Sequence, residues 1–486
     1  MNTPAQIYNS TRHKPQHYTI NQDKIMTTRI LASLLLACAT LATNAAGAKY
    51  VFYFIGDGMG MGPVLAAETY NRTVLGNDQY LTMLQFPVAS AALTYSASSK
   101  ITDSSAAGTA LSTGTKTRNG MLGMNPDTVP VYSIAKAFKE AGYGVAIATT
   151  VPVDDATPGA FYAHVPSRKM AYEIDLDLAN SGYDFFAGSR MRGMNDPAHN
   201  ADDITAALAK GGYTVATGKE DYEAKKNNPK IVLLGQNTTT EHCGYTIDSV
   251  PANLSLPYIT QACIDHMKMV APDKFFMMVE GGNIDWAGHA NDAGAMVKEI
   301  VNFNKGIALA YDFYLQHPDE TLIVVTADHN TGGMELGVAG GPIEVNLKNF
   351  DYQRVSIEAF QTVCRQWESE GREITWQQMK QYLTDYLGLY GPIEVSDETD
   401  ALIQEKFVKT FINNDSNDTR TLYTTYNEFV DTVFDVLDHA TGIGWTTTSH
   451  TGDFVPVYAV GVGADEFKGL NNNIEIPAKI LRIAGL

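Results

Sequence analysis

Short, continuous runs of hydrophobic residues recur along this chain of 486 residues and alternate with longer amphipathic segments. Six runs predict strands: 50–55, 144–149, 231–234, 275–280, 321–326 and 455–461. Runs that are apolar throughout are typical of strands buried on both faces of a sheet. Helical patterns separate them, for example over 128–143 and 293–316. This alternation predicts an α/β fold: a three-layer sandwich with a central, mostly parallel sheet between helical layers.

One region interrupts the alternation. Residues 343–440 are rich in aromatic residues, Gln and Glu, and their pattern is mostly helical. A sheet-like pattern returns only near Thr446. We therefore expect four parts, listed in chain order: a leader (1–48), an α/β core (49–342), a helical insert (343–440) and a return to the core (441–486). Because the insert starts soon after His329, at the end of a strand, we expect it on the same side as the functional site.

The amino-terminal region has the pattern of a secretory leader. Residues 26–48 contain a basic residue, an apolar stretch and then small residues, which is typical of a signal peptide. Residues 1–25 are polar, so Met26 is the expected start, with cleavage after Ala46 or Ala48. The apolar stretch is too short to span a bilayer comfortably, and no later segment reads as a membrane span. We expect a periplasmic or secreted protein.

The cysteines leave two questions open. Cys38 lies inside the leader, so a lipid anchor is a minority alternative to cleavage. Cys243, Cys263 and Cys364 follow the leader, and an odd count leaves at least one of them free. Cys243 and Cys263 flank a short polar loop and could pair in an oxidising compartment, or all three could be buried thiols.

Acidic residues and histidines stand at the ends of the apolar runs. Asp57, Glu280 and Asp328 each occupy such a position, and His329 adjoins Asp328. In a largely parallel sheet these ends meet at one edge, where ligands bind. The glycines around Asp57 superficially resemble a dinucleotide loop, but their spacing differs and an Asp would repel a pyrophosphate. Polar residues at the end of a very apolar strand are costly to bury unless they are ligated.

A second group of such residues has metal-ligand spacing. Asp285 and His289 are four residues apart and can share one face of a helix, and His450 precedes the last predicted strand. Carboxylates with imidazoles suit Zn²⁺, and carboxylates with hydroxyls and water suit Mg²⁺. Bound cations would attract a phosphate monoester, which is a dianion. The residues therefore indicate phosphoryl transfer at a multi-metal site.

A nucleophile for that chemistry is present in TDSSAAGTALSTG, residues 102–114. Asp103 is placed to cap a helix, and Ser104 falls in its first turn. The free N–H groups and partial positive charge at a helix start favour an alkoxide and a covalent phosphate. The alternative is that Ser104 is an ordinary serine of the capping region. His164, His242 and His266 are not among the candidate ligands and are interpreted as surface or core-edge residues.

Six motifs together resemble one family. FIGDGMG, TDSSAAGTA, DATPGAFYAHVPSR, VEGGNIDWAGH, TADH and SHTG stand in the order seen in alkaline phosphatases. The resemblance runs from about Lys49 to the C-terminus and is loosest over 343–440, where family members carry a variable, crown-like insert. It implies hydrolysis of small phosphate monoesters to an alcohol and inorganic phosphate, favoured at alkaline pH. It also implies a homodimer that uses two zinc ions and one magnesium ion.

The resemblance also implies a role for each motif residue. A first zinc would be held by Asp285, His289 and His450. A second zinc would be held by Asp57, Asp328 and His329. The magnesium would be held by Asp57, Thr157 and Glu280, with Asp155 binding its water. Ser104 is similar to the phosphorylated nucleophile, and Arg168 to the residue that clamps the phosphate. Trp286 supplies no cation that would retain phosphate, and its alternative role is packing under the insert.

Other functions remain in competition. A sulfatase needs a Cys/Ser-x-Pro-x-Arg context, which Ser104 lacks. A phosphodiesterase of the same superfamily has no use for a clamp on a terminal phosphoryl group, so Arg168 favours monoesters. A non-catalytic phosphate-binding protein would not need Ser104. The formal net charge of −19 argues against nucleic acid as a partner, because an acidic surface repels phosphate backbones.

Overall fold

The computed structural model describes residues 47–486 except 237–239, 342, 416–417 and 421–424. The predictions of a signal peptide, of a start at Met26 and of a lipid anchor at Cys38 lie outside the described residues. In the part of the chain that is described, no helix is both long and apolar enough to cross a bilayer.

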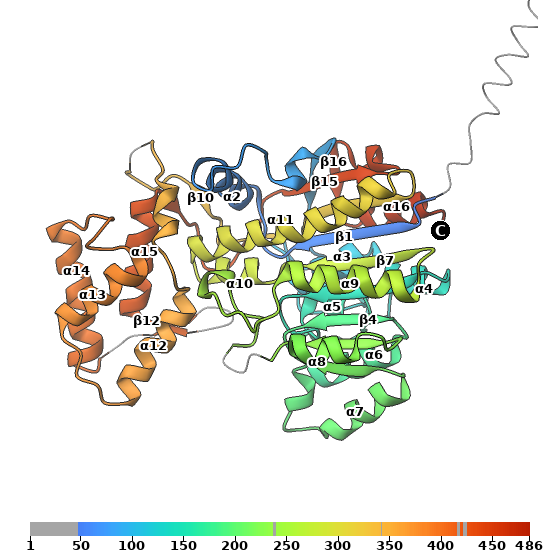
Figure 1. Cartoon of the computed structure of the whole chain (residues 1–486), viewed down its shortest axis with the longest axis horizontal. Coiled ribbons are helices and arrows are strands. Elements are labelled where there is room, and N and C mark those ends of the chain that lie inside the picture. Colours follow the sequence, from blue (N-terminus) through green and yellow to red (C-terminus); the bar gives the residue numbers. More distant parts are fainter. Residues whose placement is uncertain (1–46, 237–239, 342, 416–417, 421–424) are drawn as a thin grey trace, which may run out of the picture. The chain divides into compact units, whose positions relative to one another are not determined.

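In the described part of the chain, ten strands form one sheet, and Figure 1 shows it at the centre of the core. Their bounds are β1 (Tyr50–Gly56), β2 (Val88–Leu93), β3 (Gly144–Thr149), β4 (Phe185–Gly188), β5 (Thr214–Thr217), β6 (Ile231–Leu234), β7 (Phe275–Glu280), β8 (Thr321–Ala327), β15 (Val455–Gly461) and β16 (Leu470–Asn472). The strand order is β16-β2-β15-β8-β1-β7-β3-β4-β6-β5. All six predicted strands are confirmed, and β2, β4, β5 and β16 were not predicted.

The strands are parallel with one exception. From β8 to β5 every neighbouring pair is parallel, as is the pair of β16 and β2. Only β15 runs against both of its neighbours, β8 and β2. Its amino end therefore lies at the edge where the other strands have their carboxyl ends. β1 is buried along its whole length between β7 and β8, as its unbroken apolar run predicted.

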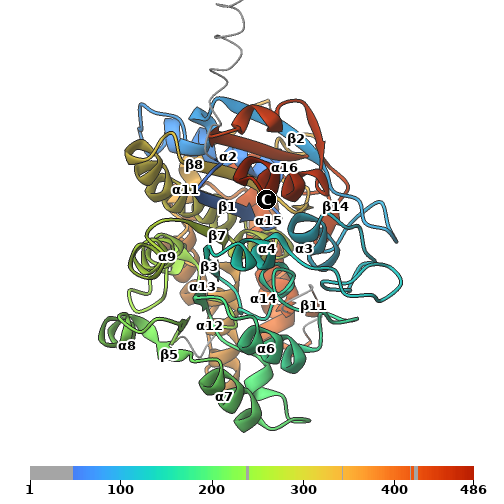
Figure 2. The ribbon, with the colours of Figure 1, turned by 90° about the vertical axis from the view of Figure 1, so that its right-hand side faces the viewer.

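Helices cover both faces of the sheet. Their bounds are α2 (Met61–Thr73), α3 (Ser104–Thr113), α4 (Ile134–Glu140), α5 (Ala156–Gly159), α6 (Ala171–Asn180), α7 (Ala201–Lys210), α8 (Gly218–Lys225), α9 (Leu256–Val270), α10 (Asn283–His289), α11 (Ala293–Gln316) and α16 (Glu475–Ala484). Figure 2 shows α8, α9 and α11 on one face and α3, α4, α6 and α16 on the other. The predicted three-layer α/β sandwich is confirmed.

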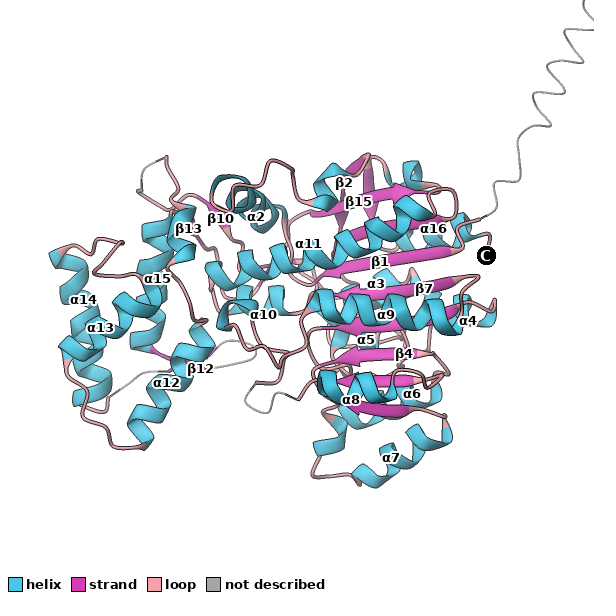
Figure 3. Cartoon of the chain, viewed as in Figure 1, coloured by secondary structure: helices cyan, strands magenta, loops and turns pink. Residues whose placement is uncertain are grey.

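The predicted insert is helical and has a hydrophobic core of its own. Its helices are α12 (Ile357–Ser369), α13 (Trp376–Leu387), α14 (Asp397–Phe407) and α15 (Glu428–Thr441). Apolar side chains between Ile357 and Leu437 pack together with Ala290 in this second core. Leu347 and Phe350 still belong to the main core, and the part boundaries at 343 and 440 stay a prediction. Figure 3 shows these helices beyond the carboxyl ends of the parallel strands.

The three cysteines after the leader are buried, free thiols. Cys263 and Cys364 are completely inaccessible to solvent, and Cys243 is nearly so. Of the two alternatives that the sequence left open, the structure has buried thiols and no bond between Cys243 and Cys263.

Candidate active site

Three carboxylates meet where β7, β1 and β8 end. In the registers of β1, Ile55 lies opposite Glu280 and Gly56 opposite Ala327, so Asp57 and Asp328 leave the sheet side by side. Gly58, directly after Asp57, has a φ of 70°, and a Cβ there would lie 2.7 Å from the hydroxyl oxygen of Thr331. Only glycine allows this close approach. The strand ends thus bring distant residues to one place, as predicted.

Ser104 enters this place from the start of α3. Asp103 caps the helix by accepting a hydrogen bond from the Ala106 N–H at 2.9 Å, as predicted. Ser104 is 1% exposed, and its Oγ lies 3.2 Å from Nε2 of His329. The N-terminus of a ten-residue helix therefore faces the carboxylate cluster and brings a partial positive charge to the serine.

Two histidines direct their Nε2 atoms at each other. Nδ1 of His289 donates to the Thr448 carbonyl at 2.6 Å, and Nδ1 of His450 donates to the Thr102 carbonyl at 2.8 Å. In the neutral rings Nε2 then carries a lone pair. These two Nε2 atoms are 3.0 Å apart. Two nitrogens bound to one zinc at about 2.0–2.1 Å would lie about 3.3 Å apart in a tetrahedral site. A shared cation accounts for this contact.

His329 has the same tautomer. Thr331 gives its only hydroxyl hydrogen to Asp285, so its oxygen accepts from Nδ1 of His329 at 3.2 Å. The lone pair on Nε2 of His329 then faces Asp328 Oδ2 at 3.1 Å and Asp57 Oδ1 at 3.5 Å. A lone pair facing two carboxylate oxygens is unfavourable unless a cation lies among them.

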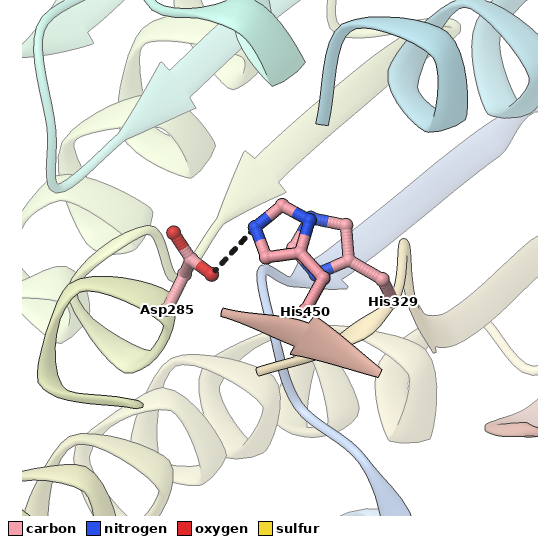
Figure 4. A group of neighbouring side chains, drawn as sticks. All are labelled: Asp285, His329 and His450. Carbon is pink, nitrogen blue, oxygen red and sulfur yellow. Dashed lines mark ion pairs between the residues drawn. The ribbon is translucent and has the colours of Figure 1, made fainter. Parts of the chain in front are cut away.

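The cluster divides into two overlapping sets of ligand atoms. One contains Asp57, Asp328 and His329, which is the set predicted for the second zinc. The other contains Asp285, His329 and His450, whose side chains point toward one another in Figure 4. His289, predicted for the first zinc, lies 3.5 Å from Asp285 Oδ2 and so borders this second set. His329 and His450 stack with ring centroids 3.6 Å apart.

Six buried oxygens of the predicted ligands make no hydrogen bond. They are Asp57 Oδ1, Asp155 Oδ2, Thr157 Oγ1, Glu280 Oε1, Asp285 Oδ2 and Asp328 Oδ2. Buried polar atoms in folded proteins nearly always have a partner, so a group of orphans at one place requires an explanation. Oxygens from carboxylates and a hydroxyl, beside imidazole nitrogens, form the donor set of bound divalent cations. The residues present fit the metals that the resemblance implies.

The charges of the cluster support the same interpretation. Burial, with the nearby Asp285, raises the pKa of Asp328 to about 7. Burial also raises the pKa of Glu280 to about 8, and that of Asp57 well above its usual range. Burial and the neighbouring His450 hold the pKa of His329 well below its ordinary value. Without cations, the site therefore favours protonated Asp57, Glu280 and Asp328 beside a neutral His329.

Asp155 and Arg168 lie beside the cluster. Asp155 caps α5, and its Oδ1 accepts from the Ala156 N–H and from Nη2 of Arg168, both at 2.7 Å. Arg168 also lies 3.9 Å from Asp103 Oδ2, next to Ser104. Burial raises the pKa of Asp155, but Arg192 and Arg168 outweigh it, and the pKa falls to about 2. The predicted phosphate clamp thus lies near the predicted nucleophile.

Sequence reasoning missed several contributors. The half-buried Arg192 pairs with the buried Asp154 next to Asp155, and its Nε lies 3.1 Å from Asp154 Oδ1. Thr102 and Thr448 fix the tautomers of the histidines through their carbonyls. Arg192 follows the end of β4. If that short strand had been predicted, Arg192 would have been expected at the same edge of the sheet as the other candidate residues.

The interpretation of the remaining histidines was partly wrong. His164 is half-buried, but His242 and His266 are buried. His242 is satisfied in the interior because it accepts from the Gly244 N–H at 3.0 Å and lies 3.0 Å from Glu358 of α12. Its ring meets Trp286 edge-on, with centroids 5.3 Å apart, and Trp286 is 7% exposed. This contact agrees with a packing role for Trp286.

A comparison with known families decides the relationship. The model of the family described as alkaline phosphatase matches residues 48–190 and 200–486. The chain belongs to the alkaline phosphatase family. Alkaline phosphatase 4 of Bacillus subtilis is 28% identical over 445 residues, which cover 90% of this chain and 88% of that protein. Members of this family are metal-dependent phosphatases, in keeping with the candidate ligand groups.

Solved structures show the same architecture. A cold-active alkaline phosphatase from a psychrophilic Shewanella is 26% identical, with a TM-score of 0.74 over 89% of this chain and 99% of that one. The alkaline phosphatase of Thermus thermophilus also gives a TM-score of 0.74 at 26% identity, over 90% of this chain and 92% of that one. The relationship extends over nearly all of the described chain, including the region 343–440.

Proposed function

We propose that this alkaline phosphatase family member hydrolyses phosphate monoesters through a phosphoserine at Ser104. One observation carries the proposal: the buried Oγ of Ser104, at a helix N-terminus, lies 3.2 Å from Nε2 of His329 and beside carboxylate oxygens that make no hydrogen bond. The alternative, a serine that belongs only to the capping region of the helix, does not explain its position beside the candidate metal ligands. The alternative of a phosphodiesterase of the same superfamily is opposed by Arg168, which suits a terminal phosphoryl group.

We further propose the metal set that the donors support. Two zinc ions would be held by Asp285, His289 and His450, and by Asp57, Asp328 and His329. One magnesium ion would be held by Asp57, Thr157 and Glu280, with Asp155 holding its water. When bound, these cations would lower the pKa of coordinated hydroxyl groups and water, and offset charge on the leaving oxygen.

The side chains of the protein would supply the rest of the chemistry. Ser104 Oγ attacks phosphorus, a new O–P bond forms, and the bond to the ester oxygen breaks to release the alcohol. Water then breaks the Oγ–P bond, which frees inorganic phosphate and restores the serine. The start of α3 stabilises negative charge on Oγ in both steps. Arg168 can hold two non-bridging oxygens with its planar fork.

Replacement of the nucleophile tests the proposal. Ser104→Ala should abolish covalent trapping of labelled phosphate and most turnover of a chromogenic monoester, while the metal content stays at the wild-type level. Ser105→Ala is a matched control, because Ser105 is equally buried but its hydroxyl donates to Asp103. Label that remains bound in Ser104→Ala would refute the assignment. A chromogenic diester assayed in parallel separates the alternative, because a diesterase would prefer it.

Two further expectations belong to this proposal. A periplasmic or secreted location rests on the leader pattern, and a homodimer rests on the family resemblance. Both stay predictions.

A further inference from the structure

Arg192 is a second guanidinium group at the predicted phosphate site. Its Nε lies 3.1 Å from Asp154 Oδ1, and its Nη2 donates to the Asp154 carbonyl at 3.3 Å. The N–H groups of Arg192 and Gly193 donate to Asp154 Oδ2 at 2.6 and 3.1 Å. Asp154 is completely buried. The backbone and the side chain of Arg192 are therefore both fixed by one carboxylate.

This fixed group also touches the carboxylate that holds Arg168. Nη2 of Arg192 lies 3.5 Å from Asp155 Oδ1, the same oxygen that accepts from Arg168 at 2.7 Å. Asp155 Oδ1 therefore faces two guanidinium groups, and Arg192 is also bound to Asp154 through Nε and Nη2.

A phosphate that binds Arg168 must compete with Asp155 for it. Two guanidinium groups that share one carboxylate oxygen each receive less of its attraction than one group alone would. A second guanidinium group beside Asp155 Oδ1 therefore weakens the hold of that oxygen on Arg168.

We infer that Arg192 is a positioning residue that offsets the charge of Asp155 and so leaves Arg168 available to bind phosphate. The inference rests on the proposed function, because it assigns Arg168 to phosphate. It adds a residue that acts through Arg168 and does not itself touch the anion.

The dissociation constant of inorganic phosphate, measured by calorimetry on the metal-loaded protein, tests the inference. Arg192→Gln should raise it roughly three- to tenfold, the range expected for losing one partly exposed charge contact. Arg192→Lys keeps the charge and should fall in between. Arg190→Gln is the matched control: it removes a cation two residues away whose side chain donates to the Thr240 carbonyl, and it should change binding less than twofold.

A double-mutant comparison decides how Arg192 acts. In an Arg168→Ala background, Arg192→Gln should cause no further change. An equal change in both backgrounds would show that Arg192 acts on the anion directly, and no change in the wild-type background would show a structural role alone; either result overturns the inference.

Two further comparisons separate a folding defect, and a failure of the proposed function, from a failure of this inference. Arg192→Gln leaves Asp154 buried without its cation, so Asp154→Asn with Arg192→Gln removes the pair as a neutral unit and should weaken phosphate binding to the same extent. Phosphate binding without monoester turnover in the wild type would contradict the proposed function alone, because calorimetry needs no catalysis.

Discussion

Removal of the metals should make the stability of the protein depend steeply on pH. Burial raises the pKa of Asp328 to about 7 and that of Glu280 to about 8, and it shifts that of Asp57 in the same direction. In the unfolded chain such acids titrate near pH 4. Above that pH, the metal-free fold holds protons that the unfolded chain has lost. Its stability is therefore complete only at low pH and falls as the pH rises through 7 and 8.

The size of the effect follows from linkage. For each proton that the fold holds in excess of the unfolded chain, the unfolding free energy falls by about 1.4 kcal/mol as the pH rises by one unit. Between pH 6.5 and 7.5, Asp328 and Glu280 together hold between one and two extra protons, which predicts a loss of about 2 kcal/mol. His329 has the opposite slope, because its pKa in the fold is lowered, but its effect is mostly confined below the unfolded histidine pKa of about 6.5. A bound dication replaces these protons, so the loaded protein should show little of this slope.

Urea unfolding at pH 6.5, 7.0 and 7.5, with a chelator and with added zinc and magnesium, measures the effect. Asp328→Asn removes one titrating acid without removing its side-chain volume. In the metal-free state, the unfolding free energy of this variant should fall less steeply with pH than that of the wild type, by up to about 1.4 kcal/mol per pH unit. An unfolding free energy that is constant or rises with pH in the chelated wild type would refute the reasoning.

Three other predictions concern single contacts and the chain start. Arg168→Ala should weaken inhibition by inorganic phosphate by roughly 1.5–3 kcal/mol, as expected for a lost charged contact, and an unchanged inhibition constant would contradict the clamp. Trp286→Ala should lower the unfolding free energy by about 3 kcal/mol and Trp286→Phe by much less; equal unfolding midpoints for both variants would contradict the packing role. The mature protein should start at Gly47 or Lys49, and an intact mass that includes residues 1–25 would contradict cleavage.

The sequence predicted the layers of the fold well because the buried strands are apolar throughout. The strands it missed carry weaker signals. Half of the residues of β2 are alanines and several of its positions are half-exposed, and β4, β5 and β16 have three or four residues each. β6 is equally short, but its four residues are all large and aliphatic, whereas β4, β5 and β16 contain small or polar residues, so their pairing in the sheet decides their structure.

The candidate site was predictable where a residue follows a strong strand or starts a helix. Asp57, Glu280 and Asp328 are positioned by local sequence, as is Ser104. Contacts that depend on tertiary structure were not predictable. The carbonyl that orients His289 could belong to any residue type, and Arg192 follows a strand that has little signal of its own.

His450 lies just before β15, the antiparallel strand, and this late position in the chain sets the order in which the parts of the site can form. His450 reaches the cluster through a two-residue ladder in which it lies opposite Thr331, just before β15 inserts between β8 and β2. A growing chain can form the other strand ends before this segment has been synthesised. The paired histidine nitrogens cannot meet until it has been, so the metal site that we propose there can be completed only after this segment has been synthesised. A chain that ends before His450 would contain His289 but would lack the second histidine of this pair.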